Sequence, residues 1–348
     1  MGEHKRVAII TDTHFGIRKG SQIFHDYFEK FYEQTFFPTL DKYGIDTIIH
    51  LGDVFDVRKN IDYWSLEWAK RVFFDPLRDR GIKAYIVVGN HDIFYKTSLK
   101  LNSPSLNLSE YDNIVTIDSP QDIVIKDTSV FMIPWLCEDN ASSFTENLGG
   151  SRSRIAMGHL ELTGFYANQN YQCNHGTNPE ILRQFDTVFS GHFHKKSTRS
   201  NITYLGNPYQ LYWNDEGDIR GFHLFDLESQ ELEFIENPTK MFHKIYYDES
   251  KSQLINPHKT KESYVKIIVE GKSTPKKLAR LVDTLYEVGI HDLKVLETLD
   301  TQVGDDVEVE AEDTLTTLTN YVNAMEESVN KQNVIEIFKS LYVEAQEV

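Results

Sequence analysis

The feature that most constrains this chain is a set of short polar clusters, each placed directly after a short apolar run. The tetrapeptide Gly89-Asn90-His91-Asp92 follows the apolar run 84–88. A run of this length, ended by loop residues, predicts a buried strand that stops at the cluster. An amide oxygen, an imidazole and a carboxylate side by side suit a divalent metal, a proton donor and a group that orients the donor. One such tetrapeptide does not define a site, so the other clusters decide its meaning.

Four further clusters carry the same chemistry at the ends of predicted strands. They are Asp12-Thr13-His14, Gly52-Asp53, Gly158-His159 and Gly191-His192-Phe193-His194. Residues i and i+2 of an extended segment point to the same side, so one carboxylate and one imidazole can reach one ion. Each pattern alone is more often a turn than a metal site, but five in one chain favour a metal centre.

The predicted ligands of this centre are Asp12, His14, Asp53, Asn90, His159, His192 and His194. Carboxylate, amide and imidazole donors of this kind hold pairs of first-row divalent ions. Two ions about 3.5 to 4 Å apart need a bridging anion. Asp53 is the natural candidate for that bridge.

The order of the expected elements indicates an α/β fold. Apolar runs that predict strands alternate with amphipathic helices at about 21–43 and 62–80. The pattern then changes to short runs that predict antiparallel strands, at 114–117, 123–125 and 130–133. Open α/β sheets place their ligands at the carboxyl ends of strands, where each cluster falls. We therefore expect two sheets packed face to face with helices outside.

The chain divides into four predicted segments. A main domain over residues 1–238 precedes a smaller α+β domain over 239–299. Residues 300–313 are acidic and predict a linker, and the apolar periodicity of 314–348 predicts two short amphipathic helices.

Charge and cysteine content restrict the setting of the protein. The formal net charge is −17, but residues 300–348 hold twelve acidic residues against two lysines, so more than half of the excess lies there. A nucleic-acid partner is therefore not excluded. Two distant cysteines indicate no disulfide framework and favour a reducing compartment. No signal peptide and no apolar run of membrane-spanning length is found, so we expect a cytoplasmic protein without a membrane partner.

The order of the five clusters resembles that of the calcineurin-like metallophosphoesterases across about residues 5–225. Within that superfamily, Asp12-Thr13-His14-Phe15-Gly16 and Gly52-Asp53-Val54-Phe55-Asp56 are similar to the SbcD branch of double-strand-break repair nucleases. The resemblance implies a four-layer αββα sandwich with a small α+β capping domain and a C-terminal helical tail.

The resemblance also implies roles for individual residues. Asp12, His14, Asp53 and His194 would bind one metal ion, and Asp53, Asn90, His159 and His192 the other. His91 would protonate the leaving oxygen, with Asp92 orienting it. The implied metal is manganese, with magnesium a poorer substitute. Archaeal and eukaryotic relatives carry a second histidine where Asp56 stands, so its role as a catalytic group or a turn residue stays open.

The implied activity is metal-dependent hydrolysis of DNA phosphodiesters, as a 3′ to 5′ exonuclease and a single-strand endonuclease. Basic residues that follow the metal loops favour a DNA substrate independently of the resemblance. They are Arg18, Lys19, Arg58, Lys59, Lys96, Lys195, Lys196 and Arg199. The small domain would cap the duplex.

Two kinds of protein partner are also implied. The terminal helices would dock on an SbcC-type coiled-coil ATPase, with self-packing on the main domain as the alternative. Relatives commonly form homodimers, and 63–74 or 103–108 are candidate contacts.

Two other functions stay open from the sequence. The chain could be a phosphatase or phosphodiesterase that acts on a small molecule or a protein. It could also be a non-catalytic DNA-binding or scaffold subunit, although degenerate ligands would be expected in that case.

Overall fold

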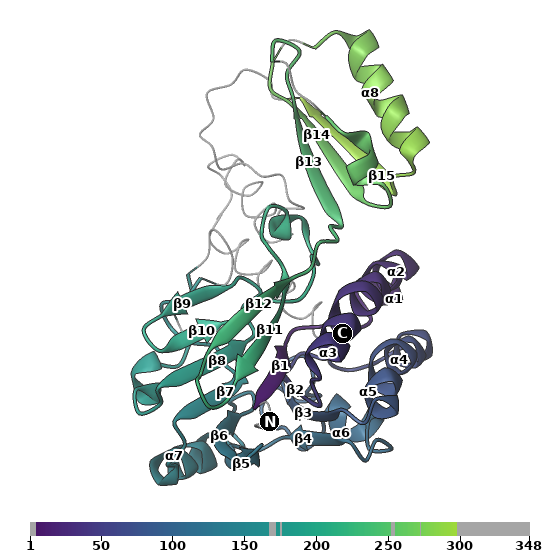
Figure 1. The fold of residues 1–348 in the computed structure, drawn as a ribbon. Helices are drawn as coiled ribbons and strands as arrows, with labels where there is room; N and C mark the ends of the chain where they lie inside the picture. Colours follow the sequence, from purple (N-terminus) through teal and green to yellow (C-terminus); the bar gives the residue numbers. More distant parts are fainter. Residues whose placement is uncertain (1–4, 167–171, 175, 252–254, 272, 298–348) are drawn as a thin grey trace, which may run out of the picture.

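Two six-stranded sheets face each other in the computed structural model, which describes residues 5–166, 172–174, 176–251, 255–271 and 273–297 (Figure 1). The first sheet has the order β12 (Leu232–Glu236), β11 (Gly221–Asp226), β1 (Arg6–Ile10), β2 (Thr47–His50), β3 (Lys83–Val87) and β4 (Ile114–Ile117). The second has the order β5 (Gln121–Ile125), β6 (Thr128–Ile133), β7 (Ile155–His159), β8 (Thr187–Gly191), β10 (Ile202–Tyr204) and β9 (Ser197–Arg199).

Helices cover the outer faces and complete the predicted αββα sandwich. The two long predicted helices are confirmed, and each contains a π-helical turn. The first is α2 (Gln22–Phe31), η1 (Tyr32–Phe36) and α3 (Phe37–Tyr43); the second is α4 (Tyr63–Ala69), η2 (Lys70–Phe74) and α5 (Asp75–Asp79). The shorter elements are α1 (Ile17–Gly20), α6 (Ser103–Asn107), α7 (Ala141–Gly150), η3 (Pro179–Leu182) and η4 (Trp213–Asp215).

Apolar side chains hold the layers of the sandwich together. Aromatic side chains of α2, η1 and η2 pack on the first sheet, with Phe31, Phe36 and Phe73 fully buried. Alternating strand residues, such as Ile9 and Met157, fill the space between the two sheets. Burial of a side chain of this size stabilises a fold by about 1.5–3 kcal/mol. The strand ends that carry the polar clusters are therefore set on a rigid scaffold.

The second half of the sandwich differs from the expected antiparallel pattern at one strand. β5 and β6 form an antiparallel hairpin as predicted. β4 instead joins the first sheet parallel to β3, with Ala84 opposite Ile114. The prediction of an antiparallel β4 was wrong because the connection through α6 is long enough to return the chain to the same end of the sheet.

A third sheet lies beyond one end of the sandwich (Figure 1). It consists of the parallel strands β13 (Phe242–Tyr247), β14 (Tyr264–Val269) and β15 (Asp292–Glu297). Helix α8 (Pro275–Val288) covers it through Leu285, and η5 (Pro257–Thr260) precedes β14. Phe242 packs into the core of the main sandwich. The domain boundaries stay a prediction, and the acidic linker and tail lie outside the described residues.

Candidate metal centre

The five polar clusters meet at one edge of the sandwich. β1, β2 and β3 run parallel in the first sheet, β7 and β8 run parallel in the second, and each cluster lies at the carboxyl end of its strand. Four predicted ligands have a left-handed backbone that side chains rarely adopt: Asp12 (φ 54°), His14 (φ 44°), Asp53 (φ 53°) and His192 (φ 87°). Strain of this kind persists where the surrounding fold enforces it, and it concentrates at functional sites.

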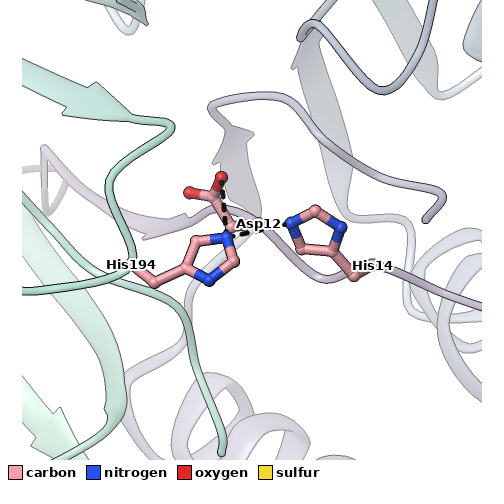
Figure 2. Close-up of side chains that lie close together, drawn as sticks. All are labelled: Asp12, His14 and His194. Atoms are coloured by element: carbon pink, nitrogen blue, oxygen red, sulfur yellow. Dashed lines mark hydrogen bonds and ion pairs between the residues drawn. The ribbon is translucent and has the colours of Figure 1, made fainter. Parts of the chain in front are cut away.

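The first group of donors is Asp12, His14 and His194 (Figure 2). The Nε2 atoms of His14 and His194 are 3.1 Å apart, and His194 Nε2 lies 4.0 Å from the Asp12 carboxylate. Asp12 and His14 are buried, whereas the His194 side chain is 22% exposed. The three side chains come from two different sheets and point toward one another.

The second group is Asp53, Asn90, His159 and His192. The Asn90 side-chain oxygen lies 2.9 Å from His159 Nε2 and 2.9 Å from His192 Nδ1. The Asp53 carboxylate lies 3.3 Å from His159 Nε2 and 3.9 Å from His14 Nε2 in the first group. Asp53 therefore stands between the two groups, where a bridging ligand would be.

Each of three ligand imidazoles has an oxygen near its second nitrogen, and for His159 this contact is a hydrogen bond. His159 Nδ1 lies 2.7 Å from the Leu51 carbonyl, and His14 Nδ1 lies 3.2 Å from the Asp56 carboxylate. His192 Nε2 lies 3.6 Å from the Glu161 carboxylate. The Leu51 carbonyl therefore fixes the orientation of the His159 ring and leaves Nε2 to bind a metal, and the two carboxylates are placed to do the same for His14 and His192.

The electrostatics of the centre keep the Asp53 carboxylate charged and the His194 imidazole neutral. Burial opposes ionisation of Asp53, but the charge of His159 holds the pKa of Asp53 well below its usual range. Burial, followed by the charges of His14 and Arg220, holds the pKa of His194 well below its usual range. These are the protonation states that metal binding requires, whereas the Asp53 carboxylate outweighs burial and raises the pKa of His159 to about 9, so a metal ion must displace a proton from that ring.

The chemistry of the donors fits a pair of divalent cations. Imidazole nitrogens lie 3.1 Å apart in the first group and 2.9 Å from an amide oxygen in the second. Two buried carboxylates, Asp12 and Asp53, lie among histidines, and each also accepts a backbone N–H, from His192 and His91 respectively. Buried charge is costly unless it is paired, and bound cations supply that pairing.

His91 lies at the rim of the centre with its ring 4.9 Å from that of His14. Its Nδ1 lies 2.6 Å from the backbone carbonyl of Asp56, so Nδ1–H donates there and Nε2 is the remaining ring nitrogen. Its backbone N–H donates to the Asp53 carboxylate at 2.8 Å. The ring is therefore oriented by Asp56, which also holds His14.

The role predicted for Asp92 needs correction. Its buried carboxylate accepts hydrogen bonds from the backbone N–H groups of Gly89, Asp53 and Val54, at 2.9, 2.9 and 3.0 Å. The His91 ring donates from Nδ1 to the Asp56 backbone carbonyl instead. Adjacent residues of this tight loop point in different directions, so Asp92 ties two loops together and does not orient the imidazole. A Cβ at Gly89 would strike the Asp53 carboxylate, which explains the glycine before Asn90.

The predicted DNA-binding residues follow the metal-binding clusters along the chain, Arg18 and Lys19 in α1, Arg199 at the end of β9 and the others in loops. Arg18, Lys19, Lys59, Lys96, Lys196 and Arg199 are exposed, whereas Arg58 and Lys195 are half-buried. Arg58 Nε donates to the Ile93 carbonyl at 3.4 Å.

Four side chains that lie beside the ligands were not predicted from the sequence. Trp135 places its ring 5.0 Å from that of His192, and Tyr212 lies parallel to His194. Arg220 binds the His194 carbonyl. Glu161 had a detectable signal, because it lies two residues after His159 at the end of a strand. The others are brought to the centre only by tertiary packing.

Comparison with known proteins agrees with the order of the motifs. The profile of the Calcineurin-like phosphoesterase family matches residues 5–196. The chain is 35% identical over 315 residues to exonuclease subunit 1 of Enterobacteria phage T4, which covers 87% of this chain and 89% of that protein. It is 24% identical over 320 residues to the DNA double-strand break repair protein Mre11 of Methanocaldococcus jannaschii, covering 85% and 83%.

Among solved structures, one described as a novel archaeal phosphodiesterase covers 67% of this chain and 99% of its own, with a TM-score of 0.35 and 13% identity. The match to the phage T4 protein confirms the resemblance that the motifs predict, to the SbcD-type nucleases and, among them, to the recombination endonuclease subunits of T-even bacteriophages.

Proposed function

Because the chain belongs to the calcineurin-like phosphoesterase family and to its SbcD-type branch, we propose that it hydrolyses DNA phosphodiesters with two bound divalent metal ions. The observation that carries this proposal is the convergence of seven oxygen and nitrogen donors from two sheets on one edge of the sandwich. The relatives named as an exonuclease subunit and a double-strand break repair protein support a DNA substrate.

The seven donors divide between two ions in this proposal. Asp12, His14, Asp53 and His194 would hold one ion, and Asp53, Asn90, His159 and His192 the other. When bound, the ions would neutralise the phosphate and lower the pKa of the attacking water. The family resemblance implies manganese, with magnesium as a poorer substitute, and the carboxylate and amide oxygens among the donors suit either ion.

His91 is the proposed proton donor to the leaving oxygen. Its Nδ1–H is engaged by the Asp56 carbonyl, so the protonated ring presents Nε2–H to the substrate. Its half-buried position next to His14, a predicted metal ligand, supports this role. General acid catalysis of this kind contributes about 10²- to 10⁴-fold to the rate.

The proposed DNA path follows the exposed cations. Arg18 and Lys19 in α1, Lys59 and Lys196 in loops, and Arg199 at the end of β9 are exposed, and Arg58 and Lys195 are half-buried. Phosphate contacts of this kind position a strand without reading its sequence. The third sheet with α8 would cap the duplex.

The decisive test compares substrates and variants in manganese. We expect the full chain to cleave plasmid and oligonucleotide DNA far faster than a nucleotide monoester. His91→Ala should reduce cleavage about 10²- to 10⁴-fold and leave calorimetric manganese binding unchanged, whereas His159→Ala should weaken both.

Each alternative predicts a different result. Preference for the monoester would favour a phosphatase, and DNA binding without any cleavage in manganese would favour a scaffold subunit. Undiminished cleavage by His91→Ala would remove the acid assignment alone.

An SbcC-type ATPase is the proposed partner, through the helices predicted over residues 314–348. Its support is the description of the phage relative as a subunit. A chain truncated after residue 299 should keep manganese-dependent cleavage and lose co-purification with a coiled-coil ATPase. Retained co-purification would reject the tail as the docking segment. The expected site of action is the cytoplasm, of the host cell if the gene is viral.

A homodimer through α4 and α6 is proposed as well. Tyr63, Trp64 and Leu106 are 91%, 45% and 62% exposed on these helices. Apolar groups exposed together mark interaction surfaces. Leu106→Asp should convert a dimer into a monomer in sedimentation equilibrium, and a wild-type monomer would refute the proposal. None of the helices in the described residues has the length and apolar character needed to cross a membrane.

A further inference from the structure

An exposed aromatic ring lies at the rim of the metal centre. Tyr212 is 41% exposed, and its ring is parallel to that of His194, with an interplanar angle of 6° and centroids 6.5 Å apart. Among the exposed large apolar and aromatic side chains of the described residues, Tyr212 is the one whose ring pairs with a predicted metal ligand. The ring therefore presents a flat surface next to the reacting centre.

A cation accompanies this ring. The guanidinium carbon of Arg18 lies 5.5 Å from the centre of the Tyr212 ring. Arg18 is exposed, and no carboxylate within the described ranges forms an ion pair with it. Its charge is therefore available to a phosphate. Arg18 and Lys19 both have left-handed backbones, with φ of 56° and 59°. Such strain is maintained only where the fold enforces it.

The position of Tyr212 is fixed by a buried network. The backbone N–H groups of Leu211 and Tyr212 donate to the Asp215 carboxylate, at 2.7 and 3.0 Å. Asp215 pairs with buried Arg220 at 2.7 Å, and Arg220 also donates to the His194 carbonyl. One guanidinium thus holds both the ligand His194 and the turn that carries Tyr212. A ring that is already ordered loses little entropy when it binds.

We propose that Tyr212, with Arg18 beside it, is the stacking platform for a base of the substrate strand next to the scissile phosphate. The base lies on the tyrosine ring, and the guanidinium of Arg18 contacts the adjoining backbone phosphate. Stacking on an aromatic ring is tolerant of sequence because every base has a π-face. This inference rests on the proposed DNA nuclease function and names Tyr212 as the residue that holds the substrate strand next to the cleaved bond.

Steady-state cleavage of a single-stranded oligonucleotide in manganese tests the platform. Tyr212→Ala should raise the KM by about 5- to 150-fold, the range that base–aromatic stacking spans on alanine substitution. Tyr212→Phe, the matched control, keeps the ring and should stay within about 2-fold. Tyr212→Leu, which is apolar and not aromatic, should behave like the alanine variant. Arg18→Gln should raise the KM and reduce its salt dependence.

A spectroscopic readout separates stacking from general damage. An oligonucleotide with 2-aminopurine beside the cleaved bond should lose fluorescence when bound to the wild type and to Tyr212→Phe. It should keep its fluorescence on Tyr212→Ala at saturating protein, while calorimetric manganese affinity stays at the wild-type value.

Two results would overturn the platform, and they are distinguishable. Wild-type cleavage together with unchanged KM and quenching in Tyr212→Ala would remove the platform and leave the nuclease function. A wild-type chain that binds manganese but neither binds nor cuts any oligonucleotide would remove both.

Discussion

Replacement of Asp92 by asparagine is the sharpest test of how the centre is built. Asp92 Oδ2 accepts the N–H groups of Gly89 and Asp53, both at 2.9 Å, and Oδ1 accepts that of Val54 at 3.0 Å and the Ser103 hydroxyl at 3.3 Å. Asparagine offers a single acceptor oxygen. In either orientation of the asparagine amide, its NH2 group therefore faces backbone N–H groups, which then have no acceptor.

The magnitude follows from the groups left unsatisfied. With the amide oxygen at the Oδ1 position, two buried N–H groups lose their acceptor, and each costs about 1–3 kcal/mol. The free energy of unfolding should fall by about 2–6 kcal/mol. The lower half of that range is expected, because the variant also removes a buried negative charge close to Asp53. The loops of Asp53 and Asn90 lose their shared tie, so manganese affinity should fall at least about 10-fold.

Urea unfolding at pH 7.5, with and without manganese, measures the first quantity, and titration calorimetry measures the second. Asp118→Asn, an exposed position, is the matched control and should change stability by less than about 0.5 kcal/mol. A variant with wild-type stability and manganese affinity but an altered pH profile of cleavage would refute the reasoning. That result would return Asp92 to the role of orienting His91.

Three further predictions follow from buried polar contacts. Burial lowers the pKa of His223 to about 3. The unfolded chain, in which this pKa is near 6.5, therefore binds a proton more readily, so the free energy of unfolding should fall as the pH drops below 6.5, on the order of 1 kcal/mol per pH unit. His223→Phe should flatten this slope in urea titrations at pH 4 to 7. Asp56→Ala should weaken manganese binding about 10- to 100-fold in calorimetry, because His14 loses the carboxylate that orients it, whereas an unchanged affinity would assign Asp56 to the turn alone. Arg220→Met leaves the buried Asp215 carboxylate unpaired and should cost about 3–5 kcal/mol in urea unfolding, and a cost under 1 kcal/mol would show that this network is not structural.

The sequence by itself determined the fold class and the chemistry of the centre. The apolar runs predicted the strands, and a polar cluster after each run placed the ligands at strand ends, because side-chain direction along a strand follows from local spacing. The helices over 21–43 and 62–80 were likewise visible from their 3.6-residue period. These features depend on residues close together in the chain.

Tertiary structure decided which atoms meet. The Asp56 carbonyl orients His91, and the Glu161 carboxylate faces His192, across 35 and 31 positions of the chain. Local spacing carries no information about such pairs, since they depend on how two sheets and their loops pack. The same reason explains Asp92, whose neighbour in sequence suggested a catalytic partner while its carboxylate binds the backbone of another loop. It also explains why Tyr212, in none of the motifs, lies beside His194.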